Sequence, residues 1–302
     1  MWFVFSIISL LCWSGADLFC KLGCQGERDR YSALKMVMAV GAVMGLHALW
    51  SIFVGGVEMN ARVLAAYLPV SLLYISSMAV GYLGMRYIEL SVSSPVCNSS
   101  GAVTVILLLL TRGAAGLPMA AFAAVALICA GVIGLGFAEA TEDEELRRAR
   151  QDSANRHYAK SPLAIALPLI YCLLDALGTF ADSILLETLN EDSANAAYEL
   201  TFLAVGLVCA VYVIIGKKQK FTFRMEAPKC VGAVFETVGQ FFYIYALADS
   251  THAAVTVPLI SGYSVGSMLL AAVFLKEKLS KKHWISVSLV IIGIIILAIL
   301  DI

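Results

Sequence analysis

Apolar residues in this chain gather into ten continuous blocks, each bounded by a polar connection. A transmembrane helix needs about 20 mostly apolar residues, and each block comes close to that length. The blocks do not alternate apolar and polar positions, so they do not fit transmembrane β-strands. We therefore predict an all-α integral membrane protein with ten transmembrane helices. The predicted spans run over about 2–22, 34–54, 66–85, 92–111, 117–138, 163–186, 196–215, 230–248, 253–275 and 284–300.

The composition supports a membrane protein. Of the 302 residues, 60% are hydrophobic and 14% are charged, whereas about 25% of a typical soluble domain is charged. The mean hydropathy is +0.85. The first block lacks the basic start of a signal peptide and carries Asp17 and Lys21, so we interpret it as a span. We expect the lipid bilayer of a prokaryotic inner (plasma) membrane.

Several function classes are excluded at this stage. The net charge of -1 leaves no basic surface field for nucleic acid. The eight cysteines have no zinc-binding spacing, and the four histidines are scattered singly, so we expect no metal and no cofactor. A phosphate-binding loop is absent from the sequence, which argues against an ATPase. An integral-membrane enzyme is therefore a weak alternative.

The chain divides into two similar halves. A charged connection, 139–162, separates a first half (1–138) from a second (163–302), and we interpret it as a solvated loop or, alternatively, a regulatory segment. Ser100-Gly101 corresponds to Ser261-Gly262, and Tyr82 corresponds to Tyr243 at the same offset. Five spans per half is an odd number, so the second half would enter the membrane inverted. Such inverted repeats surround a central cavity near the membrane midplane.

The positions of Lys and Arg predict the orientation. Of the 21 basic residues, only Arg62 and Arg112 lie at even-numbered connections between spans. Because basic connections stay in the cytoplasm, this asymmetry places both termini outside.

Several short motifs resemble the drug/metabolite transporter superfamily, and in particular its EamA-type ten-helix members. The first span carries Trp13-Ser14-Gly15 with Lys21 eight residues after the tryptophan. The fourth span, around Ser91–Gly101, is similar to the matching helix of small multidrug resistance proteins. Ser250-Thr-His252, Pro258 and Glu277-Lys-Leu-Ser280 resemble an EamA ending.

This resemblance implies a secondary transporter that moves small organic solutes through a central cavity by alternating access, with efflux as one direction. The resemblance also implies that both termini lie in the cytoplasm, whereas the charge asymmetry places them outside. We prefer the orientation that the charge asymmetry predicts. One departure concerns the first span, where small multidrug resistance proteins use a glutamate. This chain has Trp13 there, with Asp17 about a turn later and Asp175 at the equivalent part of the sixth span.

Asp175 is the leading candidate site residue. A carboxylate at membrane depth is costly unless it faces protein or water, so it is a functional-site hypothesis by default. It could bind a cationic group or couple transport to protons, or it could be a structural carboxylate. Asp182 lies two turns further on the same helical face and could be a second site on the same substrate or proton path. Asp17 and Lys21 are spaced i, i+4 and could form a helix-end pair or a gate.

Other polar positions form stripes along the spans. Each stripe could line a cavity or form interhelical hydrogen bonds, which contribute only about 1 kcal/mol each. The candidates for substrate binding, besides Asp175, are Glu236, Gln240, Tyr243, Trp13, Tyr82, Asn98, Tyr263 and Thr256.

Transport is the favoured function, and a non-transporting membrane scaffold or sensor is the alternative. An anionic solute would need Lys or Arg at membrane depth, where the chain has almost none. We therefore expect a cationic, zwitterionic or neutral small-molecule substrate. One chain holds both halves, so no oligomer is required.

Overall fold

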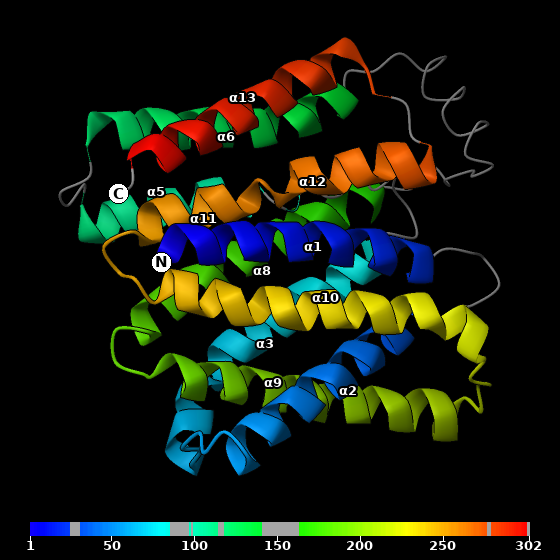
Figure 1. The fold of residues 1–302 in the computed structure, drawn as a ribbon. Coiled ribbons are helices and arrows are strands. Elements are labelled where there is room, and N and C mark those ends of the chain that lie inside the picture. The colour runs from blue at the N-terminus through cyan, green and yellow to red at the C-terminus, as the bar shows by residue number, and fades with distance from the viewer. Residues whose placement is uncertain are drawn as a thin grey trace.

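The computed structural model describes residues 1–24, 31–84, 97, 99–113, 118–140, 163–276 and 279–300. Every regular element within these ranges is helical (Figure 1). The first half contributes α1 (Trp2–Cys24), α2 (Ser32–Phe53), α3 (Ala61–Gly84), α5 (Ser100–Arg112) and α6 (Met119–Ala140). The second half contributes α8 (Leu163–Leu185), α9 (Glu191–Ala210), η1 (Val211–Gly216), α10 (Phe223–Leu247), α11 (Ala253–Ser261), α12 (Tyr263–Leu270), η2 (Ala271–Leu275) and α13 (Lys281–Leu300).

Eight helical segments of the described chain are long and apolar enough to cross a membrane. They are α1, α2, α3, α8, α9 with η1, α10, the run from α11 to η2, and α13. Two shorter apolar stretches, Ser100–Thr111 and Met119–Leu135, lie in α5 and α6. Each predicted span thus overlaps a helix, although the fourth is described only in part. Most of the connection 139–162 lies outside the described residues.

The helices of the two halves interleave. The most extensive packing pairs are α1 with α10, α2 with α9, α6 with α13 and α3 with α8, and α5 packs against both α8 and α11. Each pair joins a helix before residue 141 to a helix after residue 162. Figure 1 shows α6 and α13 along one edge and α2 and α9 along the other, with the remaining helices between them. Residues near the middle therefore come from both halves.

A close backbone crossing joins α2 to α9. A Cβ atom added at Gly41 would lie 2.6 Å from the carbonyl oxygen of Phe202 and 3.1 Å from the Cα atom of Gly206. Only glycine allows this approach, because any side chain at position 41 would meet backbone atoms. Small residues commonly mediate helix contacts in membranes, where helix association depends on close packing.

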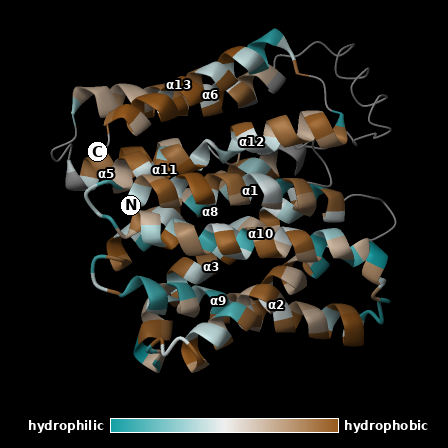
Figure 2. Cartoon of the chain, viewed as in Figure 1, coloured by the Kyte–Doolittle hydropathy of each residue, from teal (hydrophilic) through white to brown (hydrophobic). Residues whose placement is uncertain are grey.

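Hydrophobic residues predominate along the helices, and hydrophilic residues gather at many helix ends and connections (Figure 2). Large apolar side chains such as Leu46, Trp50, Leu173 and Ile295 are at least half exposed on the isolated chain. This pattern suits a protein surrounded by lipid, in which the apolar band faces hydrocarbon chains.

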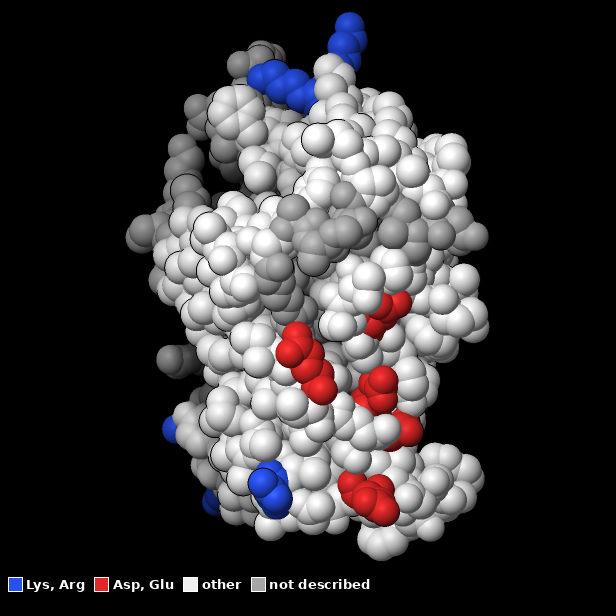
Figure 3. Space-filling view, turned by 90° about the vertical axis from the view of Figure 1, so that its left-hand side faces the viewer, with Lys and Arg blue, Asp and Glu red and all other residues white. Residues whose placement is uncertain are grey.

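Exposed charges separate between the two ends of the bundle. Acidic residues gather on the face shown in Figure 3, at the end where both termini lie. They come from the connections that follow α2, α8 and α10, together with the start of α9, and Arg62 lies among them. The acidic side chains are Glu58, Glu187, Glu191, Asp192 and Asp249. The opposite end, where η1 and η2 finish and α10 and α13 begin, carries Lys217, Lys218, Lys220, Arg224, Lys276, Lys281 and Lys282.

Candidate functional site

A cavity lies among the middle parts of the helices. It holds about 930 Å³ of space between its lining atoms, part of it open to solvent. Its wall is formed by Trp13, Asp17, Cys20, Tyr74, Met78, Gly81, Tyr82, Cys97, Ser100, Tyr171, Asp175, Thr179, Tyr198, Glu236, Gln240, Tyr243, Val257, Ile260, Ser261 and Tyr263.

Three carboxylates from three helices face this cavity. They are Asp17 of α1, Asp175 of α8 and Glu236 of α10, and all three are half-buried. Among the described residues that line the cavity there is no Lys, Arg or His. The cavity therefore holds an excess of negative charge and attracts positively charged groups.

Two of these carboxylates are held by serine hydroxyls from neighbouring helices. The Ser100 hydroxyl of α5 donates to Oδ2 of Asp175 at 2.7 Å. The Ser267 hydroxyl of α12 donates to Oδ2 of Asp17 at the same distance. Each bond fixes the orientation of a carboxylate, which can accept further hydrogen bonds at its two oxygens.

Aromatic rings cover much of the remaining wall. The ring centroid of Trp13 lies 5.1 Å from that of Tyr243 and 5.6 Å from that of Tyr263. Tyr74 packs edge-on against Tyr243, with 6.2 Å between centroids. Aromatic faces attract cations when a ligand's charge lies within about 6 Å of the ring. The carboxylates and the aromatic rings of the wall therefore both favour a cationic group on the ligand.

The indole of Trp13 rests directly on α10. A Cβ atom added at Gly239 would overlap the indole ring and would lie 2.6 Å from its Nε1 atom. The absence of a side chain at position 239 therefore sets how far the Trp13 ring reaches into the cavity.

Three hydrogen-bond donors on the wall have no partner among the described residues. They are Nε1 of Trp13, the hydroxyl of Tyr82 and Nε2 of Gln240. Leaving a buried polar group unsatisfied costs about 1–3 kcal/mol. A bound solute with acceptor atoms could satisfy these donors.

A hydrogen-bonded chain extends from the cavity to a fourth, deeper carboxylate. The hydroxyls of Tyr243 and Tyr74 are 2.6 Å apart, and Tyr74 also reaches Oγ1 of Thr179 at 3.1 Å. Beyond the cavity wall lies Asp182, which is completely buried. It accepts from Tyr67 at 2.7 Å and from Tyr74 at a longer 3.4 Å.

The structure brings together most of the side chains selected from the sequence. Those that line the cavity are Trp13, Asp17, Tyr82, Asp175, Glu236, Gln240, Tyr243 and Tyr263. Three others are completely buried outside its wall: Asp182, Lys21 and Thr256. Asn98 lies outside the described residues.

The candidates selected from the sequence leave out three cavity tyrosines, Tyr74, Tyr171 and Tyr198. Tyr171 lies four residues before Asp175 on the same helical face, a spacing that could have identified it. Tyr198 falls near the start of the span predicted at 196, where exposure is expected. The helix instead begins at Glu191, because Asn190 caps it by accepting from the backbone amides of Asp192 and Ser193. This earlier start carries Tyr198 into the interior.

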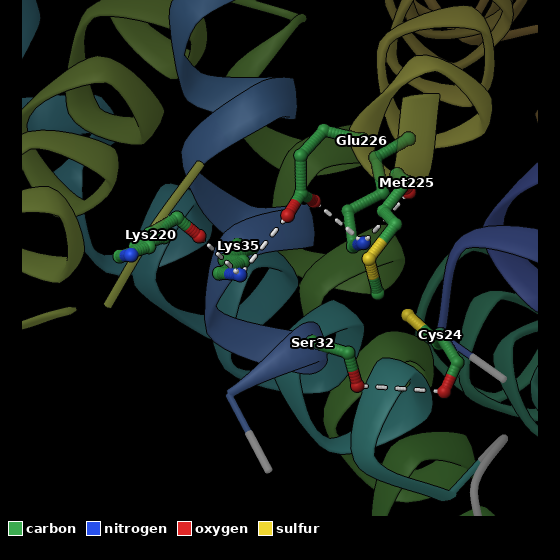
Figure 4. Close-up of polar contacts among 7 residues, drawn as sticks. Cys24, Ser32, Lys35, Lys220, Met225 and Glu226 are labelled. Carbon is green, nitrogen blue, oxygen red and sulfur yellow. Dashed lines mark hydrogen bonds and ion pairs between the residues drawn. The ribbon is translucent and has the colours of Figure 1, made fainter. Parts of the chain in front are cut away.

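A second buried charge cluster lies outside the cavity, where α2 meets α10 (Figure 4). Lys35 of α2 pairs with Oε1 of Glu226 at 3.0 Å, and Lys229 pairs with Oε2 of the same residue at 2.6 Å. Lys35 also donates to the carbonyl of Lys220 at 3.3 Å. The three paired side chains are at most 6% exposed. Lys35 and Lys229 are thus buried structural charges.

Comparisons with known proteins agree with this architecture. A family model described as the EamA-like transporter family matches residues 162–299. None of the curated proteins matches the chain. A solved structure described only as "Crystal structure of protein" is similar over 98% of this chain and 96% of its own, with a TM-score of 0.63 and 15% identity. At that identity the similarity shows the fold alone.

Proposed function

We propose, from the membership of residues 162–299 in the EamA-like transporter family, that the chain is a secondary transporter of small organic cations and zwitterions. Several long apolar helices and this family match identify an integral membrane protein. The observation that carries the substrate class is the cavity wall with Asp17, Asp175 and Glu236 and no basic side chain among its described lining residues.

The charge of the wall favours a cation for a simple reason. Carboxylates removed from water lose hydration and regain stability only from an opposite charge or from hydrogen bonds. Ser100 and Ser267 supply one hydrogen bond each to Asp175 and Asp17, but a neutral hydroxyl does not offset the negative charge of the wall. An ammonium or guanidinium group would compensate it, whereas an anionic solute would be repelled.

The other wall groups suggest what else the solute carries. Trp13, Tyr243 and Tyr263 offer ring faces to a cationic centre. The donors of Trp13, Tyr82 and Gln240, which have no partner among the described residues, suit acceptor oxygens, such as those of a carboxylate, an amide or an alcohol. A small amine with an oxygen-bearing group fits both sets.

The helix pairing supports an inverted-repeat transporter with ten spans. A two-fold axis relating the halves would exchange each span of the first half with the span five places later. Each of the pairs α2–α9, α5–α11 and α6–α13 consists of two such equivalent helices, so this exchange leaves the pair unchanged. The pair α1–α10 then maps onto α3–α8, which also pack together. A pseudo-two-fold axis through the cavity would produce this pattern, and rocking of the halves would expose the cavity to alternate sides.

A binding screen on the purified protein tests this function. Wild type and Asp175→Asn are heated with and without amines, diamines, quaternary ammonium compounds, amino acids, sugars and nucleotides. We expect cationic or zwitterionic compounds to raise the Tm of wild type and to act more weakly on the variant. Stabilisation by anionic compounds alone would refute the cation assignment. If no compound stabilises wild type, the scaffold alternative gains support.

A further inference from the structure

The described residues provide no cationic partner for the buried carboxylate of Asp182. Its side-chain contacts in the described chain are the hydroxyls of Tyr67 and Tyr74, both from α3. The other titratable groups nearby are Tyr243 of α10, bonded to Tyr74, and Tyr198 of α9, whose ring packs against that of Tyr74. No Lys, Arg or His is among the described contacts of Asp182. A completely buried carboxylate in this setting is most stable when it carries a proton.

A metal ion does not suit this position. Asp182 is completely buried and is not part of the cavity wall, so it lacks space for an ion with several ligands. The described residues also contain no cluster of three His, Cys, Asp or Glu side chains that could hold a metal. A proton needs no such space.

Glu199 provides a useful contrast. It is also completely buried, but both of its carboxylate oxygens lie 2.8 Å from Nδ1 of His47, and Asn195 donates to it at 3.0 Å. His47 can supply a compensating charge at this pair. Of these two buried carboxylates outside the cavity, only Asp182 is connected to the cavity wall by consecutive hydroxyls.

We propose that Asp182 is the proton-coupling site of the transporter, reached from the cavity through the hydroxyls of Tyr243 and Tyr74, while Asp175 serves the substrate. This inference rests on the proposed transport function and assigns the two ligands of one cycle to different carboxylates. Asp175 lies seven residues before Asp182 on α8, about 10 Å along the helix axis. The tyrosines bridge that separation.

A proton can be transferred along this chain while both tyrosines remain neutral, because each hydroxyl accepts one proton and passes on another. The Tyr243 hydroxyl accepts a proton from water in the cavity and passes its own to Tyr74. Tyr74 in turn passes its own proton to Oδ2 of Asp182, which becomes neutral. The Tyr74–Asp182 contact is 3.4 Å, so transfer requires it to shorten. The reverse sequence returns the proton to the cavity.

Tyr74 can link the state of Asp182 to the cavity because its hydroxyl has one hydrogen. That hydrogen can be donated to Asp182 or to Thr179, but not to both at once. An ionised Asp182 attracts it, and a neutral Asp182 releases it towards Thr179. Since Thr179 and Tyr243 both line the cavity, protonation of Asp182 alters the hydrogen bonds offered to the substrate.

The test separates coupling from binding in proteoliposomes that contain Asp182→Asn. A labelled cation found in the binding screen is followed in two assays, accumulation driven by a pH gradient and counterflow without a gradient. We expect Asp182→Asn to lose gradient-driven accumulation but to retain counterflow within about threefold of wild type. Glu199→Gln is the matched control and should retain both activities.

Two results would overturn the inference. One is gradient-driven accumulation by Asp182→Asn at the wild-type level, and the other is loss of counterflow in a folded Asp182→Asn protein. If that variant does not fold, Tyr67→Phe keeps the carboxylate and removes one donor to its ionised form. It should move the half-maximal pH of accumulation upwards, and an unchanged pH profile would refute the role of Asp182. If wild type binds no cation at all, the proposed function itself fails.

Discussion

At the scale of single residues, the cavity depends on side chains that need partners from distant parts of the chain. Asp175 is positioned by Ser100, 75 residues away, and Asp17 by Ser267, 250 residues away. Glu236 lies on the same wall, and no serine among the described residues donates to it in this way. This difference makes Glu236 the carboxylate most free to follow a bound cation.

Replacing Glu236 tests that role directly. A hydrogen bond to a charged group contributes about 1.5–3 kcal/mol, so Glu236→Gln should weaken binding of the cation by about 10- to 100-fold. Titration calorimetry on the purified protein measures the Kd. Glu58→Gln, an exposed change at the acidic end, is the control and should bind as wild type does. Unaltered affinity in Glu236→Gln would remove this residue from the site.

Gly239 should act on binding only through Trp13. Gly239→Ala places a methyl group against the indole and forces the ring to shift, which should weaken cation binding. In a Trp13→Ala background the same change should have little further effect, because the ring is gone. A double-mutant cycle of Kd values measures this coupling. Additive effects of the two substitutions would contradict the proposed contact.

At the scale of helices, the buried Lys35–Glu226–Lys229 cluster ties the start of α2 to the start of α10. Removing one partner of a buried ion pair usually costs about 3–5 kcal/mol, because the other charge remains buried. Glu226→Gln should therefore lower the Tm clearly in detergent. Glu226→Asp keeps the charge and should cost less. Equal melting of Glu226→Gln and wild type would show that the cluster does not stabilise the junction.

Most helices could be predicted from the sequence because each apolar block signals its own span. The start of α9 could not, since the predicted span at 196 begins after the polar first turn that Asn190 caps. The paired lysines Lys35 and Lys229 could not be recognised either. Both lie close to helix starts, where exposure is the ordinary expectation, and their burial depends on neighbours from the other half of the chain.

Most of the polar residues of the candidate site could also be predicted from the sequence. Asp175 and the stripe of Glu236, Gln240 and Tyr243 are conspicuous because polar groups in a membrane must face a cavity or another helix. Helical spacing alone cannot decide between these two surroundings. Thr256 belongs to the same kind of pattern, yet it is completely buried away from the wall.

At the scale of the whole molecule, charge is divided between the two ends of the bundle, of which Figure 3 shows the acidic one. From the positive-inside rule we predict that the lysine-rich end lies in the cytoplasm and both termini lie outside. An alkaline phosphatase fused to the C-terminus should be active in intact cells, and a green fluorescent protein fused there should stay dark. A fluorescent fusion with an inactive phosphatase would reverse this orientation.

The central claim is that this cavity carries organic cations through the membrane, with Asp175 in contact with them. Counterflow of a labelled cation in proteoliposomes tests it most directly, because it requires both binding and alternating access but no driving ion. We predict counterflow with wild type, competition by other cations but not by anions, and none with Asp175→Asn. Counterflow of Asp175→Asn at the wild-type rate, or competition by anions alone, would contradict the account.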